Sequence, residues 1–149
     1  MGAGEPQPAT RLRLERTFPV PPERVFAAFV ESEQLRLWFG PMGFEVADLL
    51  LDAVEGSDYR IAIQPPEGEP FDILGTFRTV DPPRLLAFTF CYEEPDPDDQ
   101  ETLVTVRLEP AGQGSDLVLE QAPFKTAARW ALHRDGWTDS LERLAQALT

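Results

Sequence analysis

The chain has 149 residues, of which 42% are apolar and 26% are charged, and its formal net charge at pH 7 is −13. This balance is typical of a folded globular protein, and the length suits one domain with a sizeable core. With 26 acidic residues against 13 basic ones, the chain repels phosphate groups and anionic lipid heads. Neither nucleic acid nor a membrane surface is therefore predicted as a partner.

Residues 1–10 differ in composition from the rest of the chain. Residues 1–10 are rich in Gly, Ala and Pro and hold no apolar segment of a secretory signal, so we expect a disordered lead there and a single domain over residues 11–149.

Cys91 is the one cysteine of the sequence. A lone cysteine forms no intrachain disulfide and fits a reducing compartment, so we expect a cytoplasmic protein.

The first forty residues predict a strand followed by two short helices. Residues 11–18 alternate polar and apolar side chains, which indicates a half-buried strand. Pro22 suits the first position of a helix, since its missing N–H would have no partner there. A second short helix is predicted from Ser32 to Trp38, and Gly40 and Pro41 break it.

From residue 44 onward the sequence predicts about six strands and then a long helix. Turn residues such as the run of residues 65–68 separate strands with alternating apolar positions. The strands are expected at residues 44–51, 58–63, 71–77, 85–92, 102–108 and 116–121. After Lys125 the apolar positions instead follow helical spacing, which predicts one buried helix face made of Trp130, Trp137, Leu141, Leu144 and Leu148.

This order of elements, with particular residues in place, resembles the START-like or SRPBCC superfamily. Within it, the chain is similar to the family named after the activator of heat-shock-protein-90 ATPase. Four segments carry the resemblance: residues 21–26, 35–41, 82–90 and 133–141. The resemblance implies an α+β helix-grip (START/Bet v 1-like) fold. In that fold a curved antiparallel sheet of six to seven strands surrounds a long C-terminal helix, and two short helices follow the first strand.

The resemblance also implies a cavity between the sheet and the long helix. Aromatic-lined cavities suit small hydrophobic molecules. The residues expected to line or close it are Trp38, Phe39, Tyr59, Ile61, Phe71, Ile73, Phe88, Phe90, Val104, Val106, Leu117, Leu119, Trp130, His133 and Trp137. Ordinary core packing of the same residues, with no cavity, is the alternative interpretation.

Candidates for chemistry are few. His133 is the one histidine and could act as a base or a pH-responsive group, although a structural role is the simpler interpretation. We find no motif for a catalytic triad, a phosphate-binding loop or a zinc site, so no catalytic residue, cofactor or metal is predicted.

Three functions remain open at this stage. The first is a binding module for a small hydrophobic molecule, with no catalysis. The second is a cyclase-like or hydratase-like enzyme that uses the same pocket. The third is a chaperone-associated interaction domain that makes chaperone or homodimer contacts, with the acidic loop of residues 93–99 as a docking patch.

Overall fold

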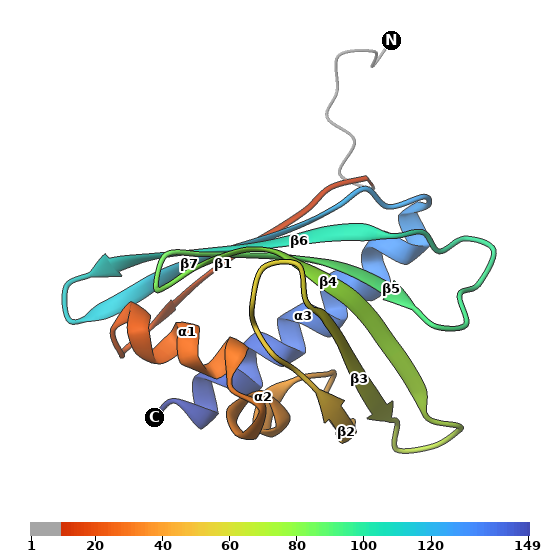
Figure 1. Ribbon diagram of the computed structural model, residues 1–149, viewed down its shortest axis with the longest axis horizontal. Coiled ribbons are helices and arrows are strands. Elements are labelled where there is room, and N and C mark those ends of the chain that lie inside the picture. Colours follow the sequence, from red (N-terminus) through yellow and green to blue (C-terminus); the bar gives the residue numbers. More distant parts are fainter. Residues whose placement is uncertain (1–9) are drawn as a thin grey trace, which may run out of the picture.

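The computed structural model describes residues 10–149, so the predicted disordered lead lies, except for Thr10, outside the described residues. Over this range the chain forms seven strands and three helices (Figure 1). In chain order they are β1 (Leu12–Phe18), α1 (Pro22–Val30), α2 (Ser32–Trp38), β2 (Glu45–Leu50), β3 (Asp58–Gln64), β4 (Phe71–Asp81), β5 (Leu85–Tyr92), β6 (Thr102–Ala111), β7 (Gly114–Ala122) and α3 (Ala127–Ala147).

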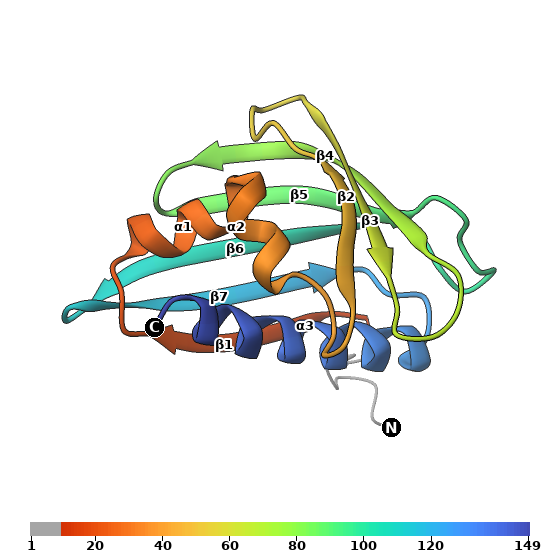
Figure 2. The same cartoon turned by 90° about the horizontal axis from the view of Figure 1, so that it is seen from below.

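All seven strands form one antiparallel sheet in the order β1-β7-β6-β5-β4-β3-β2. Strands β2 to β7 pair with their neighbours in sequence, and β1 closes the order by pairing with β7. The sheet curves over α3, and α1 and α2 lie beside α3 on the same face (Figures 1 and 2). The predicted α+β helix-grip fold is therefore confirmed.

The hairpin of β6 and β7 is longer than the sequence predicts. Pairing continues to Ala111 and Gly114, which leaves a two-residue turn at Gly112 and Gln113. Gly112 has a φ of 61°, a conformation that favours glycine. Residues near the turn carry no apolar alternation, because Glu109 and Pro110 are exposed and the buried Ser115 is polar, yet their backbones still pair. The hydrophobic pattern therefore underestimates the length of both strands.

The middle of the sheet is bent where Tyr59 of β3 lies over Gly75 of β4. The Tyr59 hydroxyl donates a hydrogen bond to the backbone oxygen of Thr89 at 2.6 Å, and the Thr89 hydroxyl accepts one from the backbone N–H of Thr76 at 2.8 Å. Side chains thus replace part of the ladder between β4 and β5, whose register shifts between Phe77 and Thr79. Such an irregularity increases local twist and curvature.

Helices α1 and α2 fill one half of the concave face. Trp38 is fully buried, and its indole N–H donates to the backbone oxygen of Ala28 at 3.0 Å. Its ring meets Phe29 edge-on, with ring centroids 4.8 Å apart. This packing joins the two helices to each other and to the core cluster beneath the sheet.

Helix α3 crosses the other half, with Trp137, Leu141 and Leu144 buried as predicted. Thr126 caps its first turn by accepting a hydrogen bond from the backbone N–H of Arg129 at 3.1 Å. Trp130 belongs to the predicted face but is only partly buried. Its indole N–H donates to the backbone oxygen of Arg11 at 2.9 Å, so the ring packs at the edge of β1.

Strand β2 forms one edge of the sheet and pairs with β3 alone. Its register shifts between Val46 and Asp48, and the side chains of Glu45 and Asp48 are exposed.

The bend predicts that Gly75→Ala strongly destabilises the protein. A Cβ at this position would lie 1.9 Å from the Thr89 oxygen and 2.4 Å from the Tyr59 ring. Both groups are fixed by the hydrogen bond between them, so we expect a loss of about 3 kcal/mol or more in urea unfolding, at the upper end of overpacking costs. A loss below about 1 kcal/mol would show that the sheet relaxes freely here.

Candidate functional site

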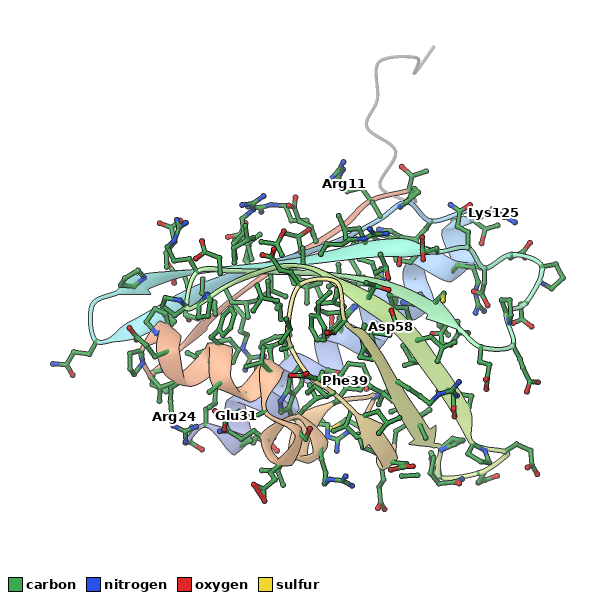
Figure 3. All side chains as sticks on the ribbon, viewed as in Figure 1. Arg11, Arg24, Glu31, Phe39, Asp58 and Lys125 are labelled. Atoms are coloured by element: carbon green, nitrogen blue, oxygen red, sulfur yellow. The ribbon has the colours of Figure 1, made fainter. Side chains whose placement is uncertain are left out.

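A groove of about 660 Å³ lies between the N-terminal half of α3 and the sheet. Its walls come from α3, the loop between α2 and β2, the start of β4, the end of β5 and the loop between β5 and β6. The aromatic and aliphatic side chains that line it are Phe39, Phe44, Phe71, Ile73, Phe90, Tyr92, Leu132 and Trp137. Phe39, labelled in Figure 3, lies on the concave side of the sheet.

The loop after α2 is attached to α3 by polar contacts. The Ser140 hydroxyl accepts a hydrogen bond from the Gly40 N–H at 3.0 Å and donates one to the Gly136 oxygen at 2.9 Å. Arg143 donates to the backbone oxygens of Gly40 at 2.9 Å and Pro41 at 3.1 Å. These bonds satisfy backbone groups that would otherwise lack partners, and they fix one wall of the groove.

Trp137 separates the groove from the solid core. It lines both the groove and a void of about 20 Å³ on the other side, and Phe39 does the same. The two rings meet edge-on, with centroids 5.8 Å apart. The Trp137 indole N–H donates to Oε1 of Gln121 at 2.8 Å, and Nε2 of Gln121 donates to the Thr102 hydroxyl at 2.8 Å. A chain of buried hydrogen bonds thus connects α3, β7 and β6.

His133 is a buried polar side chain of the groove, with 8% of its surface exposed. Rings surround it, and the centroid of Phe124 is closest at 4.9 Å. Its Nε2 lies 3.5 Å from the Tyr92 hydroxyl, a long hydrogen bond. Burial, with a smaller effect of the Arg129 charge, lowers the pKa of His133 to about 4. Burial also raises the pKa of Tyr92 to about 12, so both groups are neutral at pH 7.

The mouth of the groove carries carboxylates. They belong to Glu69, Asp72, Glu93, Glu94, Asp96 and Asp99. Arg60 forms an ion pair with Asp72 and another with Glu93 at 3.0 Å, and the bond to Arg60 lowers the pKa of Glu93.

The loop of residues 93–101, which holds four of these carboxylates, is attached to the start of α3. Arg129 contacts Asp99 at 2.6 Å, and the Asp99 side chain is only 8% exposed. Lys125 donates to the backbone oxygen of Pro97 at 2.9 Å, and Gln100 donates to that of Pro123 at 3.0 Å. Lys125 lies at the same end of the molecule as this loop (Figure 3). Arg129 also pairs with Asp96 of the loop at 3.6 Å, so several separate contacts hold the loop beside the groove.

The structure distributes the fifteen sequence-predicted site residues over four environments. Six line the groove: Phe39, Phe71, Ile73, Phe90, His133 and Trp137. Tyr59, Ile61 and Phe88 instead line the small void, together with Phe39 and Trp137. Trp38, Val104, Val106, Leu117 and Leu119 pack in the core, and Trp130 lies at the edge of β1. The alternation correctly identified the concave face of each strand. Because α1 and α2 cover half of that face, the residues there pack in the core instead of lining the groove.

Sequence reasoning missed much of the groove. Tyr92 could have been found, because it continues the alternation of Phe88 and Phe90 along β5. The wall formed by residues 40–44 and the carboxylates at the mouth lie in loops or at strand ends, where periodicity gives no signal. Gly136 of α3 faces Pro41 of this wall, whose Cγ would lie 3.8 Å from an added Cβ.

Two further features concern residues 10–149 as a whole. Within that range, no group of three or more His, Cys, Asp or Glu side chains is arranged to hold a metal ion. No helix of the described chain is long and apolar enough to cross a membrane.

A curved antiparallel sheet around a C-terminal helix, with a groove between them, defines a START-like helix-grip protein. The family model for activator of Hsp90 ATPase homolog 1-like proteins matches residues 19–149. The chain therefore belongs to this family.

Solved structures agree with that assignment. A Chromobacterium violaceum protein is 27% identical, with a TM-score of 0.86 over 93% of this chain and 96% of its own. An AHSA1 protein from Silicibacter pomeroyi is 32% identical, with a TM-score of 0.82 and the same coverage of 93% and 96%. A Rhodobacter sphaeroides protein is 25% identical, with a TM-score of 0.80 over 96% and 95% of the two chains. The comparison with curated proteins found no match.

The position of Trp137 predicts two different costs of substitution. Trp137→Ala removes a buried indole and should lower the free energy of unfolding by about 3–5 kcal/mol. Trp137→Phe keeps most of the packing but leaves the buried Gln121 oxygen without its donor, so we expect a loss of about 1–3 kcal/mol. Urea unfolding measures both. A cost near zero for Trp137→Phe would show that the hydrogen bond to Gln121 is unimportant.

The environment of His133 predicts a pH effect on stability. Its pKa is about 4 in the folded protein and near 6.5 when unfolded. The unfolded chain therefore takes up the proton first, and stability is lost as pH falls from 6.5 towards 4. Each pKa unit corresponds to 1.36 kcal/mol, so the loss is about 3 kcal/mol.

Comparison with His133→Phe isolates this loss from the titration of carboxylates. The variant should lose about 3 kcal/mol less stability than the parent over the same pH range. Because the chain has one histidine, its imidazole signal in an NMR titration needs no assignment. A midpoint near 6.5 would contradict the burial described above.

Proposed function

We propose that this chain is a non-catalytic binding module that holds a small hydrophobic molecule in the groove between α3 and the sheet. The groove itself carries the proposal: its volume of about 660 Å³ lies within the range of small-molecule sites, roughly 300–1,000 Å³. Its interior is mainly aromatic, and proteins with this fold commonly bind hydrophobic ligands.

The aromatic side chains inside the groove favour a planar or apolar occupant. Tyr92 meets Phe90 and Phe71 edge-on, with ring centroids 5.6 and 5.8 Å apart, so the floor presents both faces and edges of rings. Such surfaces pack well against flat apolar molecules. The rings are themselves packed against one another, which limits their movement and prepares the site before a ligand arrives.

A second candidate is a cyclase-like or hydratase-like enzyme. It is favoured by the proximity of Tyr92 and His133 in the groove. A phenol and a neutral imidazole 3.5 Å apart could pass a proton to a bound molecule. Their shifted pKa values, about 12 and about 4, keep each group in one protonation state near pH 7. That arrangement suits a fixed polar contact better than proton transfer, which is why we place binding first.

Gly136 offers a direct test of the groove. It lies on α3 at the groove wall, and an added Cβ would make only ordinary contact, at 3.8 Å from Pro41. Gly136→Ala should raise stability by up to about 1 kcal/mol, because Gly is a poor helix former. Gly136→Leu should place its larger side chain into the groove without disturbing the core.

The measurement is binding of the uncharged fluorescent probe N-phenyl-1-naphthylamine. The parent and Gly136→Ala should bind it with similar affinity, and Gly136→Leu should bind at least about tenfold more weakly, a loss of about 1.4 kcal/mol. Thermal unfolding verifies that both variants are folded. A parent that does not bind the probe, or a folded Gly136→Leu that binds it unchanged, would refute the proposal.

A further inference from the structure

We propose that the natural occupant of this groove is an amphipathic cation, with an apolar body and a protonated primary or secondary amine. This inference rests on the proposed function, since it concerns the chemistry of the molecule that fills the same groove. Two features carry it, the balance of charge at the mouth and the ring surfaces of the interior, and one tautomer of His133 is compatible with the same class of molecule.

The mouth carries more negative charge than the protein itself neutralises. Six carboxylates line the groove, and Arg129 is the one cationic side chain among its lining residues. Arg129 is already paired with Asp99 at 2.6 Å, and Arg60 is paired with Asp72 and Glu93. Glu69 and Glu94 are exposed and form no ion pair with any residue in the range 10–149. A cation at the mouth would therefore meet uncompensated carboxylates.

His133 is the titratable group of the interior. The residue is 8% exposed, and its one hydrogen-bonding neighbour among the described residues is the Tyr92 hydroxyl, at 3.5 Å from Nε2. A neutral imidazole has one nitrogen that accepts a hydrogen bond and one that donates. In the tautomer in which Nε2–H donates to the Tyr92 hydroxyl, Nδ1 is the accepting nitrogen, and a protonated amine supplies the matching N–H donor.

The interior favours the same class of molecule. The rings of Phe71, Phe90 and Tyr92 offer apolar surface to the body of a ligand. Their faces also carry partial negative charge, which attracts a cation at short range. An anionic amphiphile, such as a fatty acid, would gain the apolar contacts but would bring its charge towards the carboxylates of the mouth. The groove therefore discriminates by charge rather than by shape alone.

Three matched probes test the charge preference on the full chain. They share one naphthalene body and differ in the head group: 1-naphthylmethylamine, 1-naphthalenemethanol and 1-naphthoic acid. By calorimetric titration at low salt, we expect the amine to bind about 2–5-fold more tightly than the alcohol, from the modest strength of exposed ion pairs. The acid should bind more weakly than the alcohol. Both differences should shrink at 0.5 M salt because exposed charges are screened.

A pair of double variants locates the origin of the preference. Glu69→Gln with Glu94→Gln removes the two unpaired carboxylates of the mouth and should abolish most of the preference for the amine, while affinity for the alcohol stays unchanged. Glu33→Gln with Glu109→Gln removes the same charge from exposed positions outside the groove. This control should keep the preference.

The outcomes separate the inference from the proposed function. If the alcohol binds but the amine binds no more tightly, or the acid binds best, the cation preference is refuted and the hydrophobic groove stands. An equal loss of preference in both double variants would also refute it, because overall charge rather than the mouth would then be responsible. If neither the alcohol nor N-phenyl-1-naphthylamine binds, the proposed function itself fails.

Discussion

The hydrogen bond from the Trp137 indole to Gln121 fixes how closely α3 approaches the sheet. Gln121 is fully buried and bound to Thr102, so it cannot move to follow a displaced helix without losing a partner. Trp137 consequently forms one wall of the groove, and the ring of Phe39 packs against it. On one side α1 and α2 complete a solid core, and on the other side the concave face of the sheet stays open as the groove.

The opposite wall of the groove depends on α3 as well. Gly40 and Pro41 are held by Ser140 and Arg143, one turn apart on the helix, through backbone groups rather than side chains. Asp139 of α3 also accepts a hydrogen bond from the Met42 N–H at 3.1 Å. The position of this loop is therefore set by three residues of α3. A single helix thus positions both walls of the groove, while the curved sheet provides its floor.

The sequence predicted the fold more completely than the site, for a physical reason. Alternation along β3 and β5 identifies the buried face of each strand, and the spacing of Trp137, Leu141 and Leu144 identifies the buried face of α3. Neither period says which part of a buried face meets another element and which part stays open. That depends on where α1 and α2 pack on the sheet. Their position is set by tertiary contacts between distant residues, which local sequence patterns do not encode. The carboxylates of the mouth lie mostly in loops, so their convergence could not be predicted either.

The free edge at β2 has a consequence for how copies of this protein meet one another. An unpaired strand offers its backbone N–H and C=O groups to any other extended chain, which is a common route to aggregation. Here the edge carries the exposed carboxylates of Glu45 and Asp48 and an irregular register between Val46 and Asp48. Pairing of two such edges would bring like charges together, and the irregular register would prevent regular backbone hydrogen bonding. The same acidity that surrounds the groove thus protects the sheet from extending through its neighbours.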